Sequence, residues 1–282
     1  LLLCSPTGSG KTLTAFLTII DDLVRRSLDG SLPDAVQCVY ISPIKALAND
    51  IEKNLMGPLG EIKERYLPSR AKEIKVGLRT GDTPQSEREK MLRKPPHILI
   101  TTPESLGLGL ASKRFRPILD QMKWFIIDEM HSLVPTKRGT HLSLSMALMD
   151  SVVSSDVQRI GISATMEPLD AVAEFLVASD SRESDADPQK VAIAKISGDR
   201  ELDLDIILPT PRFSSIPVKE ILDHNVDRIK ELAEAHTTTL VFVNTRNMTE
   251  TVVQRLKIAG MEGVEGHHGS MDKAIRLDVE SK

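Results

Sequence analysis

The sequence predicts an α/β protein in which helices cover both faces of a parallel β-sheet. Short apolar runs alternate along the chain with segments that have the apolar spacing of an amphipathic helix. The composition agrees, because 282 residues with 40% hydrophobic and 27% charged residues describe a globular protein with room for about two domains. The chain also begins with a strand-like run, a glycine-containing loop and a helical pattern in direct succession.

The elements of the first predicted domain follow one another in order. Residues 1–4 form the end of a strand, and a helix then follows on the spacing of Leu13, Phe16, Leu17, Ile20, Leu23 and Val24. Further strands are predicted at residues 36–42, 74–78, 98–101, 124–128 and 159–163. Helices are predicted at residues 46–59, 85–92, 105–119, 142–153 and 169–177, the last of them with Pro168 at its start. We assign these elements to one α/β domain, residues 1–198.

A second unit follows two acidic segments, residues 179–188 and 199–205, which we interpret as exposed surface. Beyond Pro211 the sequence predicts a helix at 218–235, a strand at 239–244 and a helix at 248–258 that Gly260 ends. One strand and two helices are few for an α/β domain, so we assign residues 199–282 to a partial second domain. Because the chain opens inside a strand without an initiator Met, we expect both of its ends to be cut within domains.

The segment Ser5-Pro6-Thr7-Gly8-Ser9-Gly10-Lys11-Thr12 has the pattern of a phosphate-binding loop. Gly8 and Gly10 allow backbone N–H groups to surround phosphates at the positive end of the following helix. Lys11 adds a cation that reaches the transferred phosphoryl group, and the hydroxyl of Thr12 suits the magnesium ion that bridges the phosphates. Ser5 departs from the general pattern, which has glycine at that position. The expected ATP-binding residues are Thr7, Gly8, Ser9, Gly10, Lys11 and Thr12.

A pair of carboxylates, Asp128 and Glu129, follows the apolar run at residues 124–127. A carboxylate at the carboxyl end of a central strand is where a phosphate-loop enzyme holds magnesium through water, a role that fits Asp128. Glu129 is placed to polarise a water molecule for in-line attack on the terminal phosphate. The alternative is an ordinary solvated turn. Together with Lys11, the pair favours ATP hydrolysis with Glu129 and Lys11 as catalytic residues and Thr12 and Asp128 as magnesium ligands.

The motifs of the chain, taken in order, resemble those of helicases of the second superfamily, of the DExH-box type. They are the phosphate loop, Pro43-Ile44-Lys45-Ala46-Leu47, Arg79-Thr80-Gly81-Asp82, Thr102-Pro103-Glu104-Ser105, Asp128-Glu129-Met130-His131, Ser163-Ala164-Thr165, Phe242-Val243-Asn244-Thr245-Arg246 and His267-His268-Gly269-Ser270. The sequences of these motifs are most similar to those of the large helicase-related (Lhr-type) proteins, which are ATP-dependent DNA helicases. The resemblance implies two RecA-like P-loop NTPase domains, the first nearly complete and the second partial.

The resemblance also implies residue roles. His131, Ser163 and Thr165 would couple hydrolysis to strand movement. Residues at strand ends and in the following loops would grip the sugar-phosphate backbone, a contact that suits a motor indifferent to base sequence. They are Pro43, Lys45, Arg79, Thr80, Gly81, Thr102, Pro103, Thr245, Arg246, His268 and Gly269. For Arg246, His268 and Gly269 the residues themselves leave both a nucleic-acid contact and an ordinary loop position open.

The expected partner is nucleic acid, as single-stranded or partial-duplex DNA, with ATP and Mg²⁺ as cofactors. The net charge of −4 gives no overall nucleic-acid signature, so a basic surface would be local. An aromatic content of 3% argues against base stacking as the main grip, and Trp124 is expected in the core. An RNA helicase, a non-unwinding translocase and a nucleotide-gated binding module remain alternatives. Second-domain arginines would follow residue 282, so we expect this chain alone to be poorly active.

The cellular setting follows from two simple features. No apolar run approaches the length that spans a bilayer, and no signal peptide is evident. Cys4 and Cys38 lie in apolar, strand-like runs, which favours buried thiols over a disulfide or a metal site. We therefore expect a cytoplasmic protein with no membrane contact. The sequence does not indicate an oligomeric state.

Overall fold

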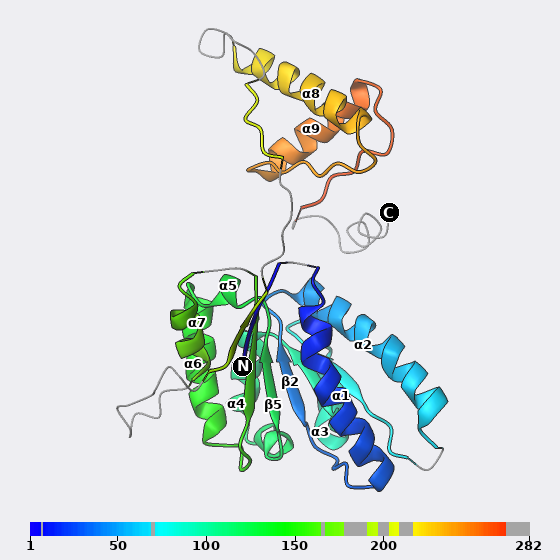
Figure 1. Cartoon of the computed structure of the whole chain (residues 1–282), viewed down its shortest axis with the longest axis vertical. Helices are drawn as coiled ribbons and strands as arrows, with labels where there is room; N and C mark the ends of the chain where they lie inside the picture. Colours follow the sequence, from blue (N-terminus) through cyan, green and yellow to red (C-terminus); the bar gives the residue numbers. More distant parts are fainter. Residues whose placement is uncertain are drawn as a thin grey trace. The chain divides into compact units, whose positions relative to one another are not determined.

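The computed structural model describes residues 1–6, 8–68, 71–164, 167–177, 191–196, 203–208 and 217–268. The chain divides into two compact units, Leu1–Arg200 and Glu201–Lys282, close to the predicted boundary after residue 198. The first unit has the predicted α/β architecture, a parallel sheet between two layers of helices (Figure 1).

The sheet of the first unit has seven strands within the described residues, in the order β3-β4-β2-β5-β6-β1-β7, and all neighbours are parallel. The strands are β1 Leu2–Cys4, β2 Cys38–Ile41, β3 Val76–Arg79, β4 Ile98–Thr101, β5 Trp124–Ile127, β6 Gln158–Ser163 and β7 Ile193–Lys195. Every residue of β2, β4 and β5 is buried, as expected for central strands covered on both faces. The predicted strands of this unit are confirmed, whereas β7 was not predicted.

Helices cover both faces of the sheet. The helices of this unit are α1 Lys11–Asp29, α2 Lys45–Tyr66, α3 Gln85–Arg93, α4 Pro103–Leu110, α5 Met130–Leu133, α6 Lys137–Asp150 and α7 Leu169–Leu176, with a 3₁₀ turn η1 at Arg116–Leu119. One core cluster joins the strands to α1 and α2, through residues such as Phe16 and Ile51. The other joins them to α4, α6 and α7, through Leu106, Met146 and Leu176. Trp124 is buried in the first of these clusters, as expected.

Two predicted helices have different bounds because side chains cap the backbone at positions that the apolar spacing does not mark. Thr136 accepts a hydrogen bond from the N–H of Gly139, so α6 begins at Lys137 rather than at residue 142. The helix predicted at 105–119 is wrong as a single element. Thr102 caps its start, and the N–H of Ser112 and the guanidinium of Arg116 bond to the last carbonyls of α4, which therefore ends at Leu110.

Two further differences concern α1 and α2. α2 continues through Pro58 to Tyr66, beyond the predicted end at residue 59, and Ile62 packs against the core in this extension. The helical spacing of α1 assigns Leu13 and Leu17 to the apolar face, yet they are 55% and 58% exposed. The buried stripe of α1 instead follows Ala15, Phe16, Ile19, Ile20 and Leu23.

The second unit contains α8 Val218–Glu234 and α9 Arg246–Ile258, which confirms both predicted helices. Val226, Val252 and Leu256 form its small core. Gly260, with φ 83°, follows the end of α9 in the left-handed conformation that glycine tolerates. Within the described residues, 239–244 form no ladder of hydrogen bonds with a strand, so the strand predicted there is wrong. An apolar, extended segment becomes a strand only when a neighbour supplies the ladder.

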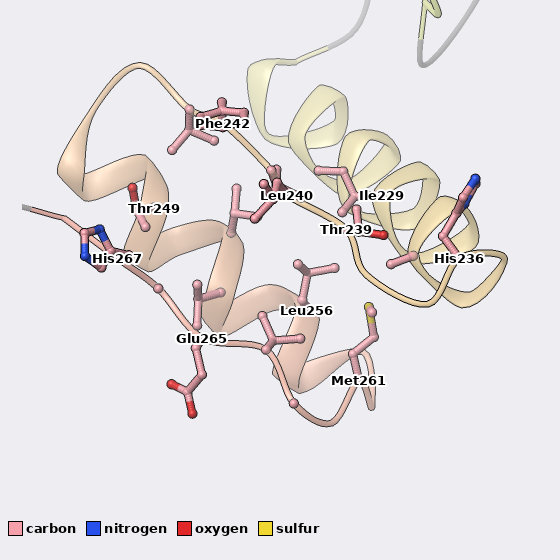
Figure 2. Close-up of a pocket in the computed structure, with 18 of the residues that line it drawn as sticks. Ile229, His236, Thr239, Leu240, Phe242, Thr249, Leu256, Met261, Glu265 and His267 are labelled. Carbon is pink, nitrogen blue, oxygen red and sulfur yellow. The ribbon is translucent and has the colours of Figure 1, made fainter. Parts of the chain in front are cut away.

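That extended segment lies beside a hollow of about 970 Å³ in the second unit. Figure 2 shows Leu240 on the segment, with Ile229 of α8 and Leu256 of α9 also lining the hollow. Leu240 and Phe242 are 78% and 89% exposed. The second unit therefore leaves much of its apolar surface uncovered among the described residues.

Candidate functional site

The loop between β1 and α1 has the backbone of a phosphate-binding loop. Gly8 and Gly10 have φ of 83° and 81°, in the left-handed region where a side chain is strained. A Cβ on Gly10 would meet no atom within 4 Å, so the requirement for glycine there is conformational rather than steric. Gly10 immediately precedes α1, whose first N–H groups are thereby directed at the loop. Thr7 lies outside the described residues.

The side chains of this loop bond to the loop itself. The ammonium of Lys11 donates to the carbonyls of Ser5 and Pro6, at 2.6 and 2.8 Å. The hydroxyls of Ser5 and Ser9 bond to each other, and Ser5 is buried. Serine in place of the usual glycine thus serves as an internal brace. Lys11 is held by neutral acceptors, which an anionic phosphate can replace.

Asp128 lies directly after β5, at the carboxyl edge of the sheet, and is buried. Its Oδ1 accepts the N–H of Glu129 at 2.8 Å, and its Oδ2 accepts the hydroxyl of Tyr40. The pairing of Tyr40 with Ile126 on adjacent strands brings these two side chains together. Burial raises the pKa of the Asp128 carboxyl, an effect that the hydrogen bonds from Tyr40 and Glu129 and the charge of Lys11 oppose.

The two residues with oxygen atoms suited to magnesium, Thr12 and Asp128, lie on elements that meet at Tyr40. The hydroxyl of Tyr40 donates to Asp128, and Thr12 is at the start of α1, whose Phe16 stacks on the ring of the same tyrosine. Magnesium is usually bound by one or two carboxylates together with substrate phosphates, rather than by a full cage of side chains. Within the described ranges no cluster of three or more His, Cys, Asp or Glu residues could hold a metal. Thr12 and Asp128 therefore fit magnesium brought in with a nucleotide.

Glu129 adopts a conformation that is unusual for its residue type. Its φ of 50° is the one positive value among the described residues other than glycine. Such a conformation costs about 1–2 kcal/mol. Its N–H bonds to Asp128, and its carbonyl accepts the N–H and the hydroxyl of Ser132, both at 2.8 Å. These bonds hold the turn that leads into α5, a short helix that the sequence did not predict.

His131 connects the ends of two adjacent strands. Its Nε2 lies 2.9 Å from Oε2 of Glu129, and its Nδ1 lies 3.2 Å from the N–H of Ala164 and 3.4 Å from the hydroxyl of Ser163. Because the amide of Ala164 donates to Nδ1, a neutral ring carries its proton on Nε2 and donates it to Glu129. The chain of contacts joins Glu129 to the residues that follow β6. Thr165 lies outside the described residues.

The residues assigned to nucleic-acid contact fall into two groups. Lys45 and Gly81 are exposed, and Lys45 forms an exposed ion pair with Asp82 at 2.6 Å. Arg88 donates to the carbonyls of Thr80 and Gly81 at 2.9 and 3.1 Å, which fixes this turn. The sequence identifies Lys45 as a candidate contact but does not predict that Asp82 pairs with it.

The other residues of the first unit in this set are largely buried. The side chains of Pro43, Thr80, Thr102 and Pro103 are buried, and the guanidinium of Arg79 lies over the ring of Phe115 at 4.6 Å. Their side chains serve the fold, so any contact with a ligand would come mainly from their backbone. In the second unit, Thr245 caps α9, Arg246 is exposed at its first position, and His268 lies 3.2 Å from Glu250 of that helix. Gly269 lies outside the described residues.

Tyr40 is the residue of this site that the sequence did not single out. The sequence does contain a signal for it, a tyrosine inside a continuous apolar run. A buried phenol needs a hydrogen-bonding partner, so such a tyrosine indicates a polar group nearby. Cys4 and Cys38 are buried free thiols, as expected. Among the described residues, no helix combines the length and apolarity of a membrane span.

These features are those of a nucleotide-dependent motor domain, and the chain belongs to the DEAD/DEAH box helicase family, whose model matches residues 1–173. It is 47% identical, over its full length, to the ATP-dependent helicase Lhr-Core of Methanothermobacter thermautotrophicus, of which it covers 33%. It is 40% identical to the Lhr helicase/probable uracil glycosylase of Mycolicibacterium smegmatis, over 90% of this chain and 16% of that protein. The chain spans about a third of the length of the Lhr-Core relatives that it matches.

Solved structures agree with the fold. A structure of Mycobacterium smegmatis helicase Lhr bound to ssDNA and AMP-PNP matches 99% of this chain, with a TM-score of 0.79 and 39% identity, and 35% of that chain is covered. The DEAD-box helicase Mss116 bound to ssRNA and AMP-PNP matches with a TM-score of 0.71 at 17% identity, over 99% of this chain and 54% of that one. The α/β class and the RecA-like architecture predicted from the motifs are confirmed. The assignment of residues 199–282 to a partial second RecA-like domain stays a prediction.

Proposed function

We propose that this chain is the ATP-hydrolysing part of an ATP-dependent helicase or translocase that acts on DNA. The observation that carries the proposal is the contact chain from Glu129 through His131 to Ser163 and Ala164. It connects a carboxylate placed for hydrolysis with the end of a neighbouring strand. A site that only bound nucleotide would have no need of this connection.

The residues divide the chemistry among them. The left-handed glycines and Lys11 bind the phosphates, while Thr12 and Asp128 would hold Mg²⁺, which offsets phosphate charge when bound. Oε2 of Glu129 is engaged by His131, which leaves its other oxygen to orient the attacking water and accept a proton from it.

Protonation of Glu129 weakens its attraction for the N–H of His131. Because the same ring bonds to Ala164, a change at Glu129 is transmitted to the segment after β6. We assign His131 and Ser163 to coupling on this basis, and Thr165 from its place in the motif Ser163-Ala164-Thr165. The exposed Lys45 and Gly81, together with backbone groups near Arg79 and Thr102, would hold the sugar-phosphate backbone without reading bases.

DNA is the proposed substrate because the Lhr structure similar to this chain contains ssDNA. An RNA helicase with the same motor is a second candidate, since an RNA-bound DEAD-box protein shares the fold. The buried thiols of Cys4 and Cys38 suit a reducing compartment, and we propose a cytoplasmic location.

The variant Glu129→Gln in the full-length gene product tests the proposal. ATP hydrolysis should fall by about 10²-fold or more, and strand separation should stop with it, while binding of single-stranded DNA is retained. Glu64→Gln, an exposed substitution on α2 with the same change of charge, is the control and should be active.

Parallel assays on forked DNA and RNA duplexes distinguish the two candidate substrates. Faster unwinding of RNA would reassign the substrate. If the wild-type protein binds nucleic acid in a nucleotide-dependent manner but neither hydrolyses ATP nor separates strands, it is a nucleotide-gated binding module and the motor assignment is wrong.

A further inference from the structure

Tyr40 is a fully buried phenol that donates a hydrogen bond to Asp128, one of the predicted magnesium ligands. It lies on β2, next to β5, and its ring stacks on Phe16 of α1, with centroids 5.3 Å apart and planes inclined by 23°. Phe16 is one helical turn beyond Thr12. The tyrosine is thus held by packing from the strand that carries it and from the helix that follows the phosphate loop.

The direction of the hydrogen bonds around Tyr40 follows from the groups involved. An ionised Asp128 can only accept, so the phenol donates its proton to Oδ2. The phenol proton is therefore committed to Asp128, and the hydroxyl group of Tyr40 fixes the position of that carboxylate oxygen.

The carboxylate of Asp128 is fixed at both oxygens. Oδ1 accepts the N–H of Glu129 at 2.8 Å and Oδ2 accepts the phenol of Tyr40. Rotation of a carboxylate about its last bond is otherwise soft, so two bonds of this kind define its plane. A carboxylate that binds a metal through water requires such a defined plane, because the water must meet both the metal and the oxygen.

We propose that Tyr40 is a positioning residue for magnesium, which orients the carboxylate of Asp128 through its hydroxyl group. This inference rests on the proposed ATP site. Tyr40 does not contact the nucleotide or the reacting atoms in this role. Its contribution should appear in the affinity for magnesium and be absent from nucleotide binding without the metal.

Tyr40→Phe tests the inference, because phenylalanine keeps the ring that packs on Phe16 and removes only the hydroxyl. Binding of a fluorescent ATP analogue is measured in EDTA and then during a Mg²⁺ titration. We expect nucleotide affinity in EDTA to stay within about twofold of wild type and the apparent Kd for Mg²⁺ to rise about tenfold, as for one buried hydrogen bond to a charged group. Tyr66→Phe, at the exposed tyrosine, is the matched control.

A double-mutant cycle with Asp128→Asn shows whether Tyr40 acts through Asp128. In that background Tyr40→Phe should change the Kd for Mg²⁺ by less than about twofold. An unchanged Kd for Mg²⁺ in the single variant, or an equal loss of affinity in EDTA, would overturn the inference while leaving the ATP site standing. A wild-type protein without Mg²⁺-dependent nucleotide binding would overturn both.

The fluorescence of Trp124 checks that each variant is folded, and an unfolded Tyr40→Phe would show that the hydroxyl supports the core rather than the metal site.

Discussion

His97 makes the stability of the first unit sensitive to mild acid, and His97→Asn should remove that sensitivity. The ring is fully buried just before β4, where its Nδ1 accepts the N–H of Lys75 at 2.9 Å. Its Nε2 has no hydrogen-bonding partner of normal geometry within the described structure. Burial, with the nearby charges of Lys72 and Lys75, lowers the pKa of His97 from 6.5 to about 4, against smaller opposing effects of Asp34 and the Pro33 carbonyl.

The sign follows from which state binds more protons. The folded ring stays neutral down to about pH 4, whereas the unfolded ring is protonated below about pH 6.5. His97 therefore does not lower the free energy of unfolding above pH 6.5, but it lowers it progressively as the pH falls toward 4. At pH 5.5 the protonated form of the unfolded ring is about tenfold more populated than the neutral form. This preference lowers the free energy of unfolding by about 1.4 kcal/mol. Solvent screening near the two lysines reduces the expected loss to about 1 kcal/mol.

The assay is urea unfolding at pH 7.5 and 5.5, followed by the fluorescence of Trp124. This is the one tryptophan of the sequence and lies in β5, so the signal reports the first unit. Asparagine keeps an acceptor for Lys75 without titrating in this range. The wild-type free energy of unfolding should fall by about 1 kcal/mol more than that of His97→Asn between the two pH values.

His141→Asn, at an exposed histidine of α6, is the control and should keep the wild-type pH dependence. Equal pH dependence of wild type and His97→Asn would refute the reasoning, since the buried ring would then not be the group that titrates.

Two further predictions concern packing and charge. In Gly161→Ala the new Cβ would collide with the side chain of Met130 and lie 2.9 Å from Leu176, so we expect the free energy of unfolding to fall by about 1–3 kcal/mol. The ATPase rate should fall as well, because Met130 follows Glu129 in the chain. An unchanged Tm would contradict this prediction. Asp82→Asn removes the charge that faces Lys45, so the Kd for single-stranded DNA should fall by about two- to fivefold at low salt, measured by fluorescence anisotropy. Glu73→Gln breaks a similar exposed pair with Lys63 and should not change that Kd.

The sequence predicts the elements whose signals are local. β4 is predicted at its observed bounds, because a short run of three apolar residues and a threonine between turns is too short for a helix and is typical of a buried strand. The glycines of the phosphate loop are equally local, since a positive φ is a property of the residue itself. The sequence does not predict an element that forms only through pairing with a distant part of the chain. β7 has exposed residues and is a strand only because β1 lies beside it.

The candidate site divides in the same way. Lys11, Asp128 and Glu129 follow from spacing, whereas the role of Tyr40 depends on the register between β2 and β5, which no single segment contains. The acidic partner of Lys45 is likewise 37 residues away in sequence. Residues 239–244 show the reverse error, because an apolar segment was given a pairing that the described residues do not supply.

The left-handed backbone at Glu129 places two opposing demands on one position. Glycine would relieve the strain and raise the stability of the folded domain, but it would remove the carboxylate that meets His131. A residue with a shorter acidic side chain would tolerate the backbone better and reach less far. Glu129→Gly should therefore raise the free energy of unfolding and abolish the proposed hydrolysis, so stability and activity place opposite requirements on this position.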